Sequence, residues 1–206
     1  MLLTNGLTLR PLLQDGETGG TPEALVIMLF MAGDTSEPAL QLARHWHPLV
    51  PRAAFLGVEL DDLIWRVDLG ALQRVITQAA EIRDLSPDQI LLVGLGQAGA
   101  LAVEMVLHGL LPALGVIARD LPLPLGRMSF PPGPAAFRLV QHCSDRDPEN
   151  VHFHTLLDDL RREDVDVRAV LLPEEPMSRP DMALRAGTGF LVELVARAGA
   201  RMIRAM

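Results

Sequence analysis

The sequence predicts a single domain, residues 1–206, built as a three-layer α/β/α sandwich around a mostly parallel sheet of about six or seven strands. Short apolar runs alternate along the chain with segments whose apolar residues recur at helical spacing. Several of these runs are continuous, which is typical of parallel strands that are buried on both faces. A length of 206 residues suits one domain with a sizeable core.

Each expected strand is a short apolar run bounded by polar or turn-forming residues, whereas each expected helix carries an apolar stripe. The expected strands are residues 7–13, 24–31, 53–58, 90–93, 114–118, 135–141 and 165–172. The expected helices are residues 36–47, 69–82, 151–162 and 181–204, together with one that starts at residue 98. Residues 121–134 are rich in proline and are expected to form an irregular loop.

The composition limits the classes of function. The net charge of −8 disfavours nucleic acid or an anionic membrane surface as a partner. No apolar run approaches the roughly 20 residues of a membrane span. The first residues lack a basic region followed by an apolar core, so no signal peptide is expected and the predicted location is cytoplasmic.

The residue types also exclude some chemistry. Cys143 is the only cysteine, which excludes an intramolecular disulfide and makes a structural zinc site unexpected. The chain has neither lysine nor tyrosine, so a lysine Schiff base and tyrosine acid-base catalysis are excluded. No cofactor or metal is expected.

A glycine-rich turn joins the strand at residues 90–93 to the following helix, and two functional motifs fit it. Gly94, Gly96 and Gly99 spell G-x-G-x-x-G, the dinucleotide fingerprint, with Asp120 at about the place of a ribose-binding acid. The turn also fits the nucleophile elbow G-x-S-x-G, with Gly96 in place of the serine. Glycines that only allow a helix to pack against a strand are the third interpretation.

The residues around this turn resemble the phospholipase/carboxylesterase family of α/β-hydrolases, which includes acyl-protein thioesterases. In that family a similar Pro-Asp segment, here Pro87-Asp88, enters the strand, and the turn reads Gly-Phe-Ser-Gln-Gly-Gly. Gly94, Gln97 and Gly99 match, whereas Gly96 replaces the serine. The resemblance spans roughly residues 24–198 and implies an α/β-hydrolase fold in which Asp120 is a turn residue.

The resemblance also assigns the oxyanion-hole loop and the catalytic acid. The family has His-Gly-x-Gly-Asp after the strand that here is residues 24–31, and a backbone N–H of that loop contributes to the oxyanion hole. Gly33 and Asp34 match, whereas Phe30 and Met31 replace the His-Gly pair and Ala32 lies between. The family's acid follows a His-Gly-x-x-Asp pattern; His142 matches its start, and Asp145 and Asp147 both remain candidates for the acid.

The catalytic histidine of the family lies in the loop after the last strand, where Met177 or Ser178 stands here. No histidine follows His154 in the sequence. With both the hydroxyl and the imidazole missing, we expect a pseudoenzyme that binds a small acyl or carboxylate ligand or a protein partner. The N–H of Gln97 and one near Ala32 would hold an oxygen of that ligand. The ligand pocket is expected at Phe30, Ala32, Gly33, Gly96, Gln97, Asp147 and Ser178.

Three other functions remain open. The first is an active ester or thioester hydrolase with displaced groups, using Ser36, Ser129, Ser144 or Ser178, or using Cys143 with His142, His152 or His154. The second is dinucleotide binding at the three glycines of the turn. The third is a metal site at His45 and His47, for which exposed histidines on a helix surface are the simpler explanation. A homodimer contact through Met202, Ile203 and Met206 is a further hypothesis.

Overall fold

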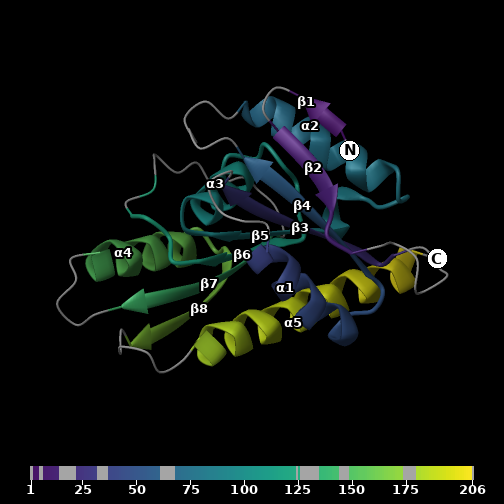
Figure 1. Ribbon diagram of the computed structural model, residues 1–206. Helices are drawn as coiled ribbons and strands as arrows, with labels where there is room; N and C mark the ends of the chain where they lie inside the picture. Colours follow the sequence, from purple (N-terminus) through teal and green to yellow (C-terminus); the bar gives the residue numbers. More distant parts are fainter. Residues whose placement is uncertain are drawn as a thin grey trace.

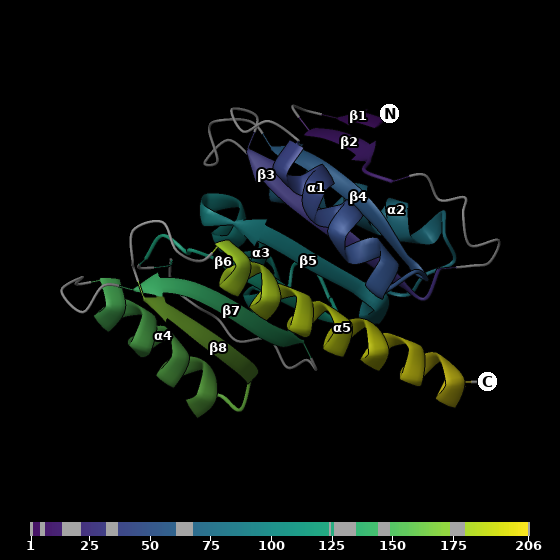
Figure 2. The same ribbon diagram turned by 60° about the horizontal axis from the view of Figure 1, so that its bottom comes forward.

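The computed structural model describes residues 2–4, 7–13, 22–31, 37–60, 68–123, 125, 135–143, 149–173 and 180–205. These residues form one eight-stranded sheet with helices on both faces (Figures 1 and 2). In chain order the strands are β1 (Leu2–Thr4), β2 (Leu7–Pro11), β3 (Ala24–Met31), β4 (Ala53–Leu60), β5 (Ile90–Leu95), β6 (Gly115–Arg119), β7 (Ala136–Cys143) and β8 (Asp166–Pro173). Their order across the sheet is β1-β2-β4-β3-β5-β6-β7-β8.

The sheet is mostly parallel, as predicted. All pairs from β4 through β3 and on to β8 run parallel, whereas β2 lies antiparallel to both β1 and β4. The strand missing from the sequence prediction is β1, which has only three residues. So short a segment carries no periodicity of its own, and its pairing with β2 completes the sheet edge.

Within the described residues, five α-helices cover the two faces of the sheet, which confirms the three-layer prediction. They are α1 (Glu37–Trp46), α2 (Leu69–Glu81), α3 (Gly96–Leu107), α4 (Glu149–Arg162) and α5 (Pro180–Ala205). One face packs against α2, α3 and α4 in a single large apolar core, and the other packs against α1 and α5 in a smaller one (Figure 2).

The continuous apolar runs arise because the central strands are buried from both sides. Leu25, Ile27 and Leu29 of β3 belong to the core beneath α2, α3 and α4. The intervening Val26 and Met28 belong to the core beneath α1 and α5. Successive side chains of a strand point to opposite faces, so both sets must be apolar.

Helices α1 and α5 contact each other through Trp46, the last residue of α1. The indole N–H of Trp46 donates to the Thr188 hydroxyl at 2.9 Å, and that hydroxyl donates to the Leu184 carbonyl at 2.7 Å. A Cβ at Gly187 would lie 3.4 Å from the indole ring. The indole ring therefore lies directly against α5, at a distance where even a methyl group would make only an ordinary van der Waals contact.

An ion-pair cluster holds α5 to the outer strands. The guanidinium of Arg138 on β7 has no exposed surface, and it contacts Asp166 on β8 at 3.0 Å and Glu193 on α5 at 2.8 Å. Arg197 bridges the same two carboxylates. Burial acts to raise the pKa of Asp166, but hydrogen bonds from Arg138 and Arg197 outweigh it and lower that pKa to about 2.

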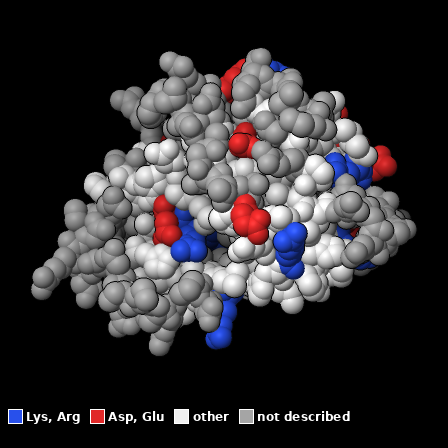
Figure 3. All heavy atoms as spheres, viewed as in Figure 1, with Lys and Arg blue, Asp and Glu red and all other residues white. Residues whose placement is uncertain are grey.

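Charges of both signs are interspersed on one face of the described surface. On the face seen in Figure 3, the acidic and basic side chains of the described residues alternate and form no extended patch of one sign. None of the helices in the described ranges has both the length and the apolar character needed to cross a membrane.

Candidate functional site

The site predicted at the glycine-rich turn has the expected strand–turn–helix form. β5 ends at Leu95, and α3 begins at the next residue, Gly96. Gly96 has a φ of +53°, a left-handed conformation that side chains disfavour. A Cβ built there would have one neighbouring heavy atom within 4 Å among the described residues, the backbone oxygen of Asp120 at 4.0 Å. Backbone conformation, and not crowding within this part of the chain, is therefore what favours glycine here.

The other two glycines of the turn have a packing explanation. A Cβ on Gly94 would lie 2.6 Å from the backbone nitrogen of Gly99, and one on Gly99 would lie 2.8 Å from the carbonyl oxygen of Gly94. Both distances are too short for real atoms, so α3 lies against β5 only because both residues lack side chains. The G-x-G-x-x-G spacing is thus accounted for at these two positions without a nucleotide.

The N-terminal turn of α3 has accessible residues within the described part of the chain. Leu95, which precedes the helix, forms no side-chain cap within the described part of the chain. The first N–H groups of a helix have no partner inside it. Leu95 is 47% exposed and Gln97 is also exposed, so the rim of this turn is accessible.

A series of polar contacts joins the carboxyl ends of β6 and β7, at the same end of the sheet as the glycine-rich turn. Nδ1 of His142 on β7 lies 2.7 Å from Oδ1 of Asp120, the residue that follows β6, and the backbone N–H of His142 donates to the same oxygen at 3.1 Å. Nε of Arg119 donates to the other carboxylate oxygen at 2.9 Å. Asp120 has a φ of +53°, which aspartate tolerates better than most residues.

This chain of contacts keeps Asp120 ionised. Burial acts to raise the pKa of Asp120, but the hydrogen bonds from His142 and the charge of Arg119 outweigh it and hold the pKa below its usual value. Sequence reasoning treated Asp120 as a turn residue and did not connect it with His142. The two are 22 positions apart and meet only because β6 pairs with β7, so no local pattern signals the contact.

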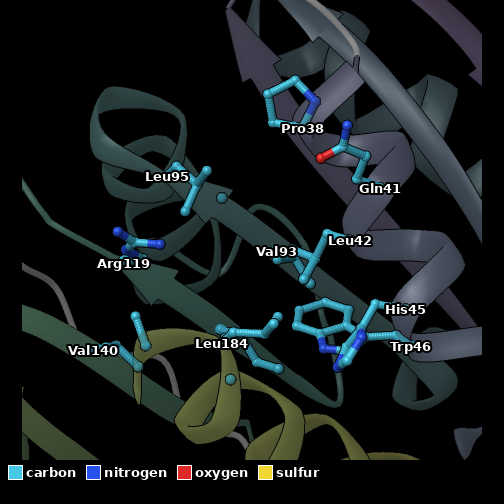
Figure 4. A pocket seen from close by; sticks show the side chains of 14 residues that line it. Pro38, Gln41, Leu42, His45, Trp46, Val93, Leu95, Arg119, Val140 and Leu184 are labelled. Carbon is cyan, nitrogen blue, oxygen red and sulfur yellow. The ribbon is translucent and has the colours of Figure 1, made fainter. Parts of the chain in front are cut away.

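A pocket of about 440 Å³ opens beside the turn, between the sheet and helices α1 and α5 (Figure 4). Its walls are apolar side chains from both helices and from the strands, among them Leu42, Trp46, Val93, Ile117 and Leu184. Among the described lining residues, the polar side chains include those of Gln41, His45 and Arg119. Leu95 also lines the pocket, so the pocket lies next to Gly96, the following residue in the chain.

The structure describes only part of the predicted site. Gly96 and Gln97 lie at the N-terminal end of α3, whereas the buried Phe30 packs over the position that a Cβ of Gly57 would occupy. The remaining predicted pocket residues, namely Ala32, Gly33, Asp147 and Ser178, lie outside the described residues. So do Asp34, Ser36, Ser129, Ser144, Asp145, Met177 and Met206.

The histidines of the other hypotheses are spread over the molecule. His152 and His154 are exposed on α4. His45 is exposed on α1, and the ring of His47 packs edge-on against Phe55 with 6.2 Å between the ring centres. Cys143 is the last residue of β7. Its side chain, like those of Met202 and Ile203 on α5, is not among the side chains that the structure describes.

Comparison with known proteins identifies the fold. No family model and no curated protein matches the sequence. Among solved structures, esterase PE8 has a TM-score of 0.68 at 18% identity, with 91% of this chain and 97% of the other covered. A phospholipase/carboxylesterase from Dyadobacter fermentans has a TM-score of 0.63 at 13% identity, covering 92% and 97%. A variant of SOBER1 from Arabidopsis thaliana has a TM-score of 0.62 at 16% identity, covering 85% and 99%.

These identities are low, so the similarity establishes the architecture and not the activity. The chain has the α/β-hydrolase fold, as the sequence resemblance predicted. Solved structures with this fold include a phospholipase/carboxylesterase from Dyadobacter fermentans and a carboxylesterase from Bacillus cereus.

Proposed function

We propose that this protein is a non-catalytic member of the α/β-hydrolase fold that binds a small acyl or carboxylate ligand beside the glycine turn. The observation that carries the proposal is Gly96, which has the left-handed backbone of a nucleophile elbow but no hydroxyl. Serine hydrolysis also needs an imidazole to take the proton of the hydroxyl. The sequence contains no histidine after His154, where the resembled family has its catalytic one.

Support for ligand binding comes from the pocket next to Gly96. A volume of about 440 Å³ falls within the range of small-molecule sites, and its mostly apolar lining with few polar groups is typical of them. The N-terminal turn of α3, which Leu95 does not cap, adds N–H donors close to the rim. These features suit an apolar molecule with one polar or charged end.

A second candidate function is hydrolysis by displaced groups, and the contact between His142 and Asp120 favours it. A general base is commonly oriented by a carboxylate on its other ring nitrogen, and Nδ1 of His142 lies 2.7 Å from Asp120. In this candidate, His142 would take a proton from the hydroxyl of a nucleophile such as Ser144, and the resulting alkoxide would attack an ester or thioester and expel its alcohol or thiol.

The experiment that separates the two candidates is labelling of the purified protein with a fluorophosphonate probe, followed by mass spectrometry. We expect no adduct under conditions that fully label an active carboxylesterase, and no hydrolysis of p-nitrophenyl butyrate above the rate with heat-denatured protein. An adduct on one serine, abolished by His142→Ala, would overturn the proposal and assign the displaced base. Hydrolysis without an adduct, abolished by Cys143→Ala, would assign the thiol instead.

A further inference from the structure

The charged end of the ligand has a candidate partner in the pocket lining. We infer that Arg119 binds the head group of a monocarboxylate whose apolar body fills the pocket between α1, α5 and the sheet. This inference rests on the proposed function and adds to it the class of ligand and the residue that selects it. Sequence reasoning placed the ligand oxygen at backbone N–H groups only and assigned no role to Arg119.

Arg119 lies at the point where the pocket meets the glycine turn. It is the last residue of β6 and pairs in the sheet with Leu95, the residue before Gly96. Its side chain lines the pocket and is 37% exposed, so it is accessible to a ligand. Figure 4 shows it on the sheet side of the pocket, across from Gln41 and His45 on α1.

The guanidinium is held at one edge and open at the other. Its Nε donates to Asp120 Oδ2 at 2.9 Å, and Asp120 is in turn held by His142. Within the described part of the chain, the two terminal nitrogens of Arg119 have no hydrogen-bond partner. A guanidinium fixed through Nε presents these two nitrogens as a fork that matches the two oxygens of a carboxylate.

The rim of the pocket on the α1 side, opposite Arg119, disfavours an anion. This defines which end of the ligand lies at Arg119. Gln41 donates one of its two amide N–H groups to Glu37 at 3.1 Å, which places the carboxylate of Glu37 beside this rim. The charge of that carboxylate repels a negative head group. Arg119 is the one arginine among the described residues of the pocket lining, so the carboxylate is expected at the sheet side.

The walls between the two rims define the rest of the ligand. Trp46 and Leu42 from α1, Leu184 from α5, and Val93 and Ile117 from the sheet leave an apolar space. Burial of an alkyl or aromatic body there is favourable by roughly 25 cal/mol per Å² of apolar surface removed from water. The pocket therefore suits an unesterified monocarboxylate more than a neutral ester or amide of the same size.

The test compares ligands that differ only in charge. Isothermal titration of the protein with octanoate and with octanamide is expected to give octanoate an affinity at least about tenfold higher, because charge-assisted hydrogen bonds exceed neutral ones. Arg119→Gln should abolish this preference while leaving octanamide binding unchanged. Arg161→Gln, on the exposed surface of α4, is the matched control and should keep the preference.

The outcomes distinguish the inference from the proposed function. Equal binding of octanoate and octanamide to the natural protein, or a preference that persists in Arg119→Gln, would overturn the role of Arg119 and leave the pocket intact. Failure of both ligands to bind would overturn the proposed function itself. Leu184→Trp, which fills the pocket, should weaken both ligands equally.

A second measurement uses only the natural protein, so it does not require any variant to fold. Raising the salt concentration should weaken octanoate and not octanamide in the natural protein, because added ions screen the charge of Arg119. An octanoate affinity that is independent of salt would contradict the inference.

Discussion

The two faces of the sheet are held together in different ways. Helices α2, α3 and α4 pack on one face through a large continuous apolar core, and α3 approaches β5 so closely that Gly94 and Gly99 leave no room for a side chain. Helices α1 and α5 cover the other face with a smaller core that leaves the pocket open. There, polar contacts hold the helices, from Trp46 to Thr188 and from Arg138 to Glu193.

This difference separates stability from binding. A tightly packed face leaves no space for a ligand, and a change of one methyl group there affects folding. Directional contacts at the edges of the other face keep α1 and α5 in place while an apolar gap persists between them. Substitutions on the first face should therefore change stability, and those around the gap should change binding first.

The largest expected difference in stability between the two faces comes from replacing one leucine on each face with alanine. Leu72→Ala on α2 should lower the free energy of unfolding by about 2–5 kcal/mol, because the side chain is fully buried and leaves a cavity. Leu184→Ala on α5 should cost less than about 1 kcal/mol, since that side chain already borders empty space. Urea unfolding measures both, and equal losses would contradict the comparison.

An alanine placed at a glycine on each face should have effects of opposite sign. Gly94→Ala should destabilise by about 1–3 kcal/mol, because its Cβ would meet the backbone of α3 and push the helix outward. Gly189→Ala should stabilise by about 0.5–1 kcal/mol, because Gly189 is an exposed residue within α5 and a Cβ there meets no atom of the described residues within 4 Å. Thermal unfolding of both variants checks the signs; destabilisation by Gly189→Ala would count against an open α5 surface.

The smallest expected effect is a loss of α5 protection in acid. The pKa of Asp166 is lowered to about 2 in the folded protein, from an ordinary value of 3.8. Its contribution to stability is therefore complete above about pH 4 and is lost as the pH falls toward 2. The effect is modest because the carboxylate is 41% exposed and screened by water.

Hydrogen exchange measures this acid effect helix by helix. Between pH 4 and pH 2, amides of α5 should lose protection earlier than those of α3, which packs on the sheet through the large apolar core. In Asp166→Asn, the difference between the two helices should shrink. Simultaneous loss of protection in both helices of the natural protein would show that the ion-pair cluster does not distinguish the faces.

The sequence predicts the elements of this fold well because their patterns are strong. The run at 24–31 becomes β3 with the same bounds, and the stripe at 69–82 becomes α2 with one residue fewer. Both segments combine clear periodicity with distinct ends, and Asp68 caps α2 by accepting from the N–H of Ala71. β1 escaped prediction because three residues fix no period.

The candidate site was predictable only where it follows from local backbone chemistry. Gly96 was identified because a strand–turn–helix junction needs an unusual backbone conformation, and its φ of +53° agrees. The contacts among Arg119, Asp120 and His142 were not predictable, since they depend on which strands lie side by side. The pocket was hidden for the same reason, because its walls come from several elements that are far apart in the chain.

The contact between Trp46 and Thr188 makes the pocket visible to spectroscopy. The indole of Trp46 lines the cavity, is only 2% exposed and is oriented by its bond to Thr188. An occupant that touches the ring changes the polarity around it and hence its emission, so the protein carries an intrinsic optical sensor for its own pocket. A library of unlabelled small acids can therefore be screened by fluorescence. The control with a filled pocket should then be Leu184→Phe, because Leu184→Trp would add a second indole to the pocket.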